Sequence, residues 1–150
     1  MPARLKWPII IISALVVLFL AYRFYFVTFV NPRVVEELHT DPQGTRAARV
    51  MLLSLPDGKQ IPVNYLLEGN KVFAGADGRW WHVFTGEGIP VTMLIKGQEL
   101  KGHGIVILDN QPYVDDVFSR LRPAAPDWLP DWLNGKLIEI TIKEKDAEHD

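Results

Sequence analysis

The sequence contains no cysteine. This absence excludes disulfide bonds, thiolate metal sites and a cysteine nucleophile, but it leaves the compartment open, because chains without cysteine occur on both sides of a membrane. The chain also lacks a phosphate-binding loop, a dinucleotide fingerprint and a serine–histidine–aspartate arrangement, and its glycines are isolated turn residues. Its histidines and carboxylates do not follow the spacing of any metal geometry, so we expect no metal site.

Charge is missing from a long stretch near the amino terminus. No charged residue occurs between Pro8 and Tyr22, and apolar residues resume after Arg23. A helix of this length can cross a hydrocarbon layer of about 30 Å. A cleavable signal peptide would have a shorter apolar region and a small-residue cleavage site, which this stretch lacks. The sequence therefore predicts a retained transmembrane anchor over residues 1–30, in contact with the lipid bilayer.

The charges outside this segment limit the possible partners. Basic residues flank the apolar stretch on both sides, so they do not fix its orientation. The anchor takes up Arg4, Lys6 and Arg23 and no acidic residue, which leaves the rest of the chain net negative. Because an acidic domain lacks the basic surface that binds phosphate backbones, we expect no nucleic acid partner.

The remaining chain changes texture at residue 49. Residues 31–48 mix prolines, acids and small polar residues, which predicts a linker, with one or two helical turns beginning at Pro32. Short β-forming runs then alternate with turn signals such as Pro-Asp-Gly and Gly-Asn. Pro62 indicates a strand edge or a bulge, and Gly102 with Gly104 a bend or a bulge. The expected strands are 49–55, 59–68, 71–76, two within 90–109, and 136–142, with a helix over 111–122 and a short helical link over 78–84.

This order of elements predicts a mainly β (α+β) domain over residues 49–143. Six short strands joined by hairpins, with one helix, are typical of a six-stranded antiparallel split barrel with a flanking helix. The charged residues 144–150 are expected to form a disordered tail.

Four sequence features within residues 58–109 follow one another in a distinctive order. They are Gly75 near the end of a strand, the aromatic pair Trp80 and Trp81, the strand beginning Pro90 to Thr92, and the hairpin from Gly97 to Gly102. Together they resemble the split β-barrel proteins of the deazaflavin-dependent nitroreductase type, which are relatives of the pyridoxamine-phosphate oxidase fold. The resemblance covers residues 49–143.

This resemblance implies a bound flavin (FMN) or deazaflavin and an oxidoreductase activity on a quinone-like acceptor. It also implies that the barrel pairs as a homodimer and lies on the cytoplasmic side of the cell membrane, where reduced cofactor is available. The cofactor-binding residues that it implies here are Lys59, Tyr65, Arg79, Trp80, Trp81 and His82. Lys59 and Arg79 would meet the cofactor phosphate, Trp80 would wall the ring, and His82 or Tyr65 would supply a proton.

The sequence departs from the family pattern at both phosphate-binding positions. The turn "LPDGKQ" keeps Gly58 and Lys59 without the family's Arg-Lys pair, and the shortened loop "ADGR" offers Arg79 as its one cation. A phosphate needs several convergent donors to replace its water. A second hypothesis is therefore a cofactor-free barrel that serves as a non-catalytic accessory subunit of a larger membrane complex, as a contact platform for the other subunits.

Two tryptophan-rich segments each have a structural and a functional interpretation. Trp80 and Trp81 either plug the barrel and pack under the linker, which we favour, or line a flat ligand pocket. The stretch "APDWLPDWL" over residues 125–133 either closes one end of the barrel or meets the membrane interface or a partner subunit.

Overall fold

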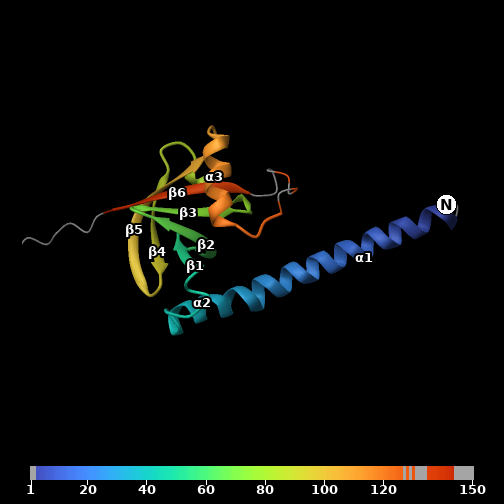
Figure 1. The fold of residues 1–150 in the computed structure, drawn as a ribbon. Helices are drawn as coiled ribbons and strands as arrows, with labels where there is room; N and C mark the ends of the chain where they lie inside the picture. The colour runs from blue at the N-terminus through green and yellow to red at the C-terminus, as the bar shows by residue number, and fades with distance from the viewer. Residues whose placement is uncertain (1–2, 127, 129, 131–134, 144–150) are drawn as a thin grey trace, which may run out of the picture. The chain divides into compact units, whose positions relative to one another are not determined.

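The computed structural model describes residues 3–126, 128, 130 and 135–143 (Figure 1). The chain divides into two compact units, Met1–Glu37 and Leu38–Asp150. The expected tail at 144–150 lies outside the described residues, as does most of the second half of the tryptophan-rich stretch at 125–133.

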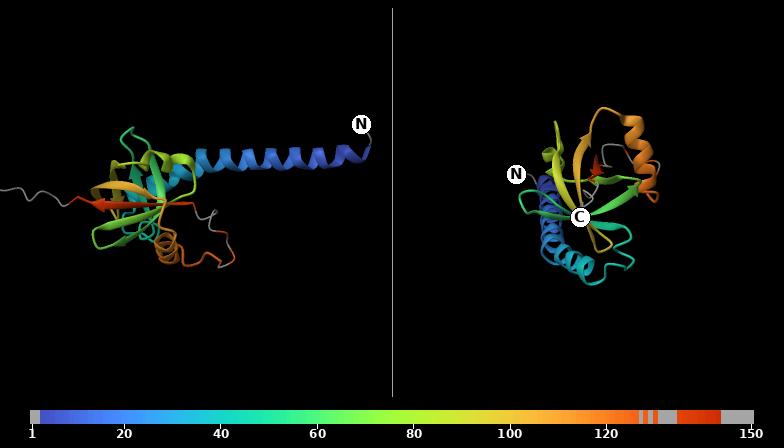
Figure 2. Two further views of the ribbon diagram at one scale, coloured as in Figure 1. Left: turned by 90° about the horizontal axis from the view of Figure 1, so that it is seen from above. Right: turned by 90° about the vertical axis from the view of Figure 1, so that its left-hand side faces the viewer.

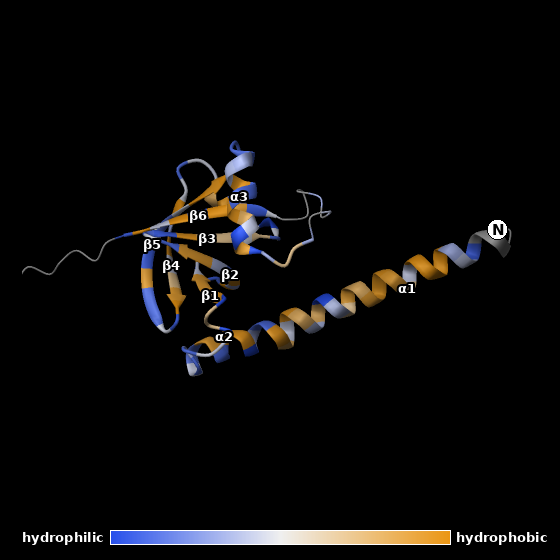
Figure 3. Ribbon diagram, in the orientation of Figure 1, coloured by the Kyte–Doolittle hydropathy of each residue, from blue (hydrophilic) through white to orange (hydrophobic). Residues whose placement is uncertain are grey.

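The first unit is helical. It contains α1 (Ala3–Tyr25), the π-helical turn η1 (Phe26–Val30) and the beginning of α2 (Asn31–Thr40). Most of α1 consists of apolar residues (Figure 3), and their side chains are exposed. By length and composition this is one helix that can cross a membrane, as the sequence predicts.

The second unit is a closed antiparallel barrel of six strands in the order β1-β2-β3-β6-β5-β4 (Figures 1 and 2). The predicted fold class is therefore confirmed, including the flanking helix α3 (Gln111–Leu121). The strands are β1 (Val50–Ser54), β2 (Gln60–Glu68), β3 (Lys71–Ala76), β4 (Ile89–Ile95), β5 (Gln98–Ile107) and β6 (Lys136–Ile142). A short 3₁₀ helix, η2 (Arg79–Phe84), joins β3 to β4.

Tight turns join the first strands, and their backbone explains their residues. Gly58 and Gly69 have φ angles of 86° and 61°, and each lies in a turn on one side of β2. Glycine adopts this left-handed region at the least steric cost, so these two residues fix where β2 begins and ends.

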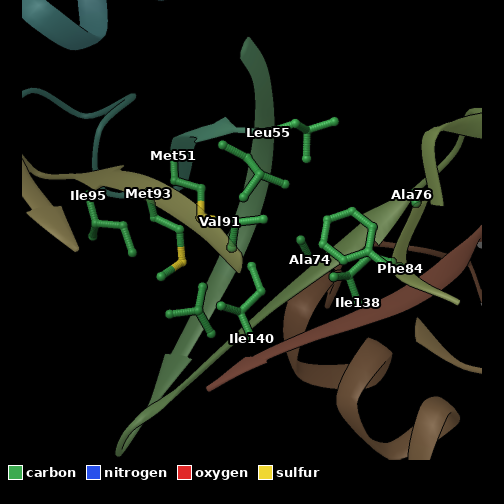
Figure 4. Packing of buried hydrophobic residues seen from close by; sticks show 12 residues of the cluster. Met51, Leu55, Ala74, Ala76, Phe84, Val91, Met93, Ile95, Ile138 and Ile140 are labelled. Carbon is green, nitrogen blue, oxygen red and sulfur yellow. The ribbon is translucent and has the colours of Figure 1, made fainter. Parts of the chain in front are cut away.

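The barrel interior is a single apolar cluster built from alternate residues of the strands (Figure 4). Phe84 from η2 is fully buried within this cluster, between residues of several strands. A side chain carried by the link between β3 and β4 therefore fills part of the barrel, and its volume sets which residues β5 can carry.

Gly104 and Gly102 lie opposite buried side chains and do not form a bulge. The pairing of β5 with β4 and with β6 runs through both glycines without a change of register. A Cβ atom on Gly104 would lie 2.6 Å from Phe84 Cε1, and one on Gly102 would lie 2.7 Å from Ile140 Cγ2. Of the predicted bend or bulge, the bulge is wrong, because these glycines make room for the core and leave the strand pairing regular.

The outer face of the sheet carries α3 (Figure 2). Its first turn is capped by Asn110, whose side chain accepts a hydrogen bond from the Tyr113 backbone N–H at 3.3 Å. The buried face of the helix joins residues of β3 and β6 in a second apolar cluster, made of Phe73, Val114, Val117, Phe118, Leu121 and Leu137. This packing fixes where the carboxyl end of α3 lies on the sheet.

Candidate functional site

The strands β2 and β3 pair along only part of their length. Counted from the turn that joins them, their last pair is Tyr65 with Ala74. Beyond it the first half of β2 pairs with β1 alone, and the end of β3 pairs with β6 alone. Pro62 lies in this half of β2, in unbroken register with β1, so the predicted strand edge is confirmed and the bulge is not.

A cavity of about 680 Å³ borders this separation of the two strands. It lies between the start of β1, the middle of β2 and the end of α3 with the residues that follow it. Its lining residues are Ala48, Arg49, Asn64, Tyr65, Arg120, Leu121, Arg122, Pro123, Ala124 and Ala125. The volume is within the range of about 300 to 1,000 Å³ that is usual for small-molecule sites.

Three arginines line this cavity, and two of them are already paired with carboxylates. Arg120 bonds Glu68 at 2.7 Å and Asp116 at 2.6 Å, and Arg122 bonds Asp77 at 2.9 Å. Arg49 forms no ion pair with any residue that the structure describes. The guanidinium of Arg49 is therefore the cation best able to take an anionic ligand.

Tyr65 contributes the phenol of the cavity wall. Its hydroxyl donates a hydrogen bond to the carbonyl oxygen of Ala47 at 3.2 Å. Burial raises the pKa of Tyr65 above its ordinary value of 10.0. The phenol is therefore neutral near pH 7, and its one proton lies in the hydrogen bond to Ala47.

Arg122 ties the end of α3 to the glycine-rich segment after β3. Its guanidinium lies 5.3 Å from the centre of the Phe118 ring and pairs with Asp77. A Cβ atom on Gly75 would lie 2.6 Å from Arg122 Nη2 and 3.0 Å from Phe118 Cε1. The glycine at position 75 thus allows the arginine and its ring partner to lie directly on the strand.

The indoles of η2 lie against the barrel core. Both Trp80 and Trp81 pack on the interior cluster. Trp80 meets the ring of Phe84 edge to face, with centroids 5.9 Å apart, and Trp81 stacks on His82 at 3.7 Å. Neither indole is among the residues that line the cavity beside β2, so their position agrees with the structural interpretation of this aromatic pair.

The two predicted phosphate-binding cations flank the strands that separate. Lys59 is exposed and immediately precedes β2, and its backbone N–H donates to Asp57 Oδ1 at 2.9 Å. Arg79 is exposed and begins η2, three residues after β3 ends. The structure places each of them at the end of one of the separating strands, whereas Tyr65 lines the cavity itself.

Sequence reasoning missed the three arginines of the cavity. Arg49 is the last residue before β1, and Arg120 and Arg122 lie at the end of α3, so no local motif joins them. Only the packing of α3 on β3 and β6 brings these segments together. The sequence carries a partial signal, since Arg120 and Arg122 are spaced two residues apart at the end of an amphipathic helix.

The cavity suits the anionic part of a flavin or deazaflavin better than its ring. Arg49 supplies N–H donors for a phosphate, and the volume is sufficient for a small ligand. Tyr65 is the one aromatic residue in the lining, so the cavity has little aromatic surface against which a flavin ring could stack. A scan of protein-family models and a search of curated proteins find no match to this chain. The six-stranded barrel does not by itself identify the split-barrel family, so the resemblance rests on its sequence motifs.

Proposed function

We propose that the chain is a membrane-anchored split-barrel oxidoreductase that uses a flavin (FMN) or deazaflavin. The observation that carries this proposal is the cavity beside the separated strands β2 and β3. It brings together the neutral phenol of Tyr65 and the guanidinium of Arg49, which has no ion-pair partner among the described residues. The order of motifs from Gly75 to Gly102 supports the same family. A bound flavin or deazaflavin would supply the hydride chemistry.

The chain's own residues bind and orient the ligand. Arg49 neutralises an anionic tail with parallel N–H donors. Lys59 lies opposite Leu55, at the other end of β1 from Arg49, and neither Lys59 nor Arg79 lines the cavity. Their contact with the cofactor phosphate rests on the resemblance alone. The Tyr65 hydroxyl holds a proton at the cavity wall and is positioned by the carbonyl of Ala47.

The helical segment determines which acceptor is accessible. A barrel held at a bilayer meets lipid-soluble molecules at a high local concentration. We propose a quinone-like acceptor in the membrane and a single-pass anchor in the cell membrane, with the barrel on the cytoplasmic side, where reduced cofactor is available.

The test is a spectrum followed by a titration. The full chain is purified in mild detergent, its visible absorbance is recorded, and FMN and a deazaflavin cofactor are then titrated into cofactor-free protein. We expect binding of one of them, weakened about tenfold by Arg49→Ala and less by Arg49→Lys, because lysine keeps the charge without the bidentate donors. The control Lys96→Asn removes one exposed charge that is not among the residues lining the cavity. Absence of binding by both cofactors, or equal losses in Arg49→Ala and Lys96→Asn, contradicts the proposal.

A second candidate is an accessory subunit of a membrane complex with no cofactor. Two of the three cavity arginines are already paired with carboxylates, and the indole of Trp128 is 78% exposed, as aromatic residues at protein interfaces often are before assembly. A colourless protein that purifies in fixed proportion with other membrane proteins would favour this candidate. A coloured protein without partner subunits, as a monomer or a homodimer, would favour the oxidoreductase.

A further inference from the structure

A second hollow lies in a different wall of the barrel, where β1 leaves its neighbour β4. These strands pair only from Leu52 with Leu94 to Ser54 with Thr92. The chain then turns away from β4 at Pro56, while β4 extends back to Ile89. A cavity of about 280 Å³ occupies this place, lined by Ser54, Leu55, Pro56, Pro90, Val91, Thr92, Lys101, Gly102 and Lys143. We call it the lysine groove.

The strand register brings four polar side chains to the lysine groove in one row. Ser54 pairs with Thr92, and Thr92 pairs with Lys101. The row continues to Lys143, whose backbone N–H donates to the Lys101 carbonyl at 2.9 Å. Two hydroxyl-bearing residues and two lysines, from segments far apart in the sequence, therefore line one small hollow.

The two lysines give the groove a positive charge. Neither Lys101 nor Lys143 forms an ion pair with a residue in the described part of the chain. The Ser54 hydroxyl oxygen accepts a long contact from Gln60 Nε2 at 3.5 Å, which leaves its own O–H free to donate. The one acidic residue of β5, Glu99, lies two residues from Lys101 on the same face, and it is not among the lining residues.

We propose that the lysine groove binds a phosphate-type oxyanion. Two ammonium groups and two hydroxyl donors match the several acceptor oxygens of a phosphate group. The volume is below the usual range for whole small-molecule ligands, so one phosphate group is a better fit than a nucleotide. This site shares no lining residue with the Arg49 cavity, so it stands or falls independently of the proposed oxidoreductase.

The experiment measures binding of inorganic phosphate to the full chain in a nonionic detergent, by phosphorus NMR line broadening at low ionic strength. We expect saturable broadening, and each of Lys101→Gln and Lys143→Gln should raise the phosphate Kd about tenfold, because each removes a charge-assisted donor. The control Lys96→Asn removes the same charge from an exposed turn between β4 and β5, and asparagine tolerates the positive φ at that position. It should leave the Kd within about twofold.

Two sources of phosphate are distinguished by a second arm. The chain is placed in phosphatidylcholine nanodiscs with and without phosphatidic acid, and the inorganic phosphate titration is repeated. If phosphatidic acid abolishes the broadening, a lipid headgroup is the ligand; if it has no effect, the ligand is a soluble phosphate. The proposal is overturned if the wild-type protein shows no saturable broadening, or if Lys96→Asn weakens binding as much as Lys101→Gln and Lys143→Gln do.

Discussion

The hydroxyl of Tyr113 in α3 donates a hydrogen bond of 2.5 Å to the carboxylate of Glu139 in β6. Glu139 is 9% exposed, and its other oxygen lies 2.9 Å from Lys71 Nζ. Removing the donor with Tyr113→Phe leaves a buried charge short of one bond, which should lower the free energy of unfolding by about 1.5 to 3 kcal/mol. Urea unfolding of the detergent-solubilised chain, followed by tryptophan fluorescence, measures this loss.

Tyr65→Phe is the matched control for that substitution. It also removes one phenolic hydrogen bond, but the acceptor is the neutral carbonyl of Ala47, so the expected loss is smaller, about 0.5 to 1.5 kcal/mol. The phenylalanine at position 113 keeps the edge-to-face contact with Phe73, whose ring centroid lies 6.3 Å away. If Tyr65→Phe lowers the free energy of unfolding as much as Tyr113→Phe or more, the charge on the acceptor adds nothing to stability.

The hydrogen bond between Tyr113 and Glu139 also predicts a loss of stability at alkaline pH. Burial, followed by the hydrogen bond to Glu139, raises the pKa of Tyr113 to about 12 from 10.0. Because the folded state favours the neutral phenol, its stabilisation is complete below pH 10 and is lost as the pH rises toward about 12. The difference in unfolding free energy between wild type and Tyr113→Phe should therefore shrink over this interval. A difference that stays constant over this interval would argue against a raised pKa of Tyr113.

Gly104 and Phe84 are expected to be coupled through their volumes. Gly104→Ala places a methyl group 2.6 Å from the buried Phe84 ring, and overpacking of this kind destabilises by about 1 to 3 kcal/mol. Phe84→Leu removes part of that ring and should partly rescue the alanine variant, so the two losses should not add in a double-mutant cycle. Additive losses in urea unfolding would mean that the ring and the new methyl group do not meet.

The strands and their order were predictable because local signals agree with the fold. Gly58 and Gly69 lie in turns that require positive φ, and β4 shows the expected alternation of buried and more exposed positions. In β6 the residues from Leu137 to Ile140 are all buried, because α3 covers part of its outer face. The prediction of a bulge at Gly104 failed because the reason for that glycine lies twenty residues away, in the ring of Phe84. A requirement for space across a barrel leaves no signal in the neighbouring sequence.

The site was less predictable than the fold for the same reason. Tyr65 was identified through the resemblance, and it does line a cavity. Arg49 was missed because its role depends on where α3 ends on the sheet, and that position is set by the apolar packing of Phe118 and Leu121. The row of polar residues in the lysine groove depends on strand register. Hydropathy patterns and turn signals in the sequence define that register only approximately.

The apolar helix predicts how the chain behaves with membranes. Leu15 and Leu18 are 59% and 66% exposed, three residues apart on α1, and a central arginine in such a helix costs about 2.5 to 3.5 kcal/mol on insertion. The wild-type chain should stay with membranes through an alkaline carbonate wash, whereas the double variant Leu15→Arg with Leu18→Arg should be lost from them. The matched control, Leu67→Arg with Leu108→Arg, places the same charges at exposed positions of the barrel unit and should remain membrane-bound. Release of the wild-type chain by carbonate would instead indicate attachment at the membrane surface, because an inserted helix keeps its apolar side chains in lipid until detergent replaces it.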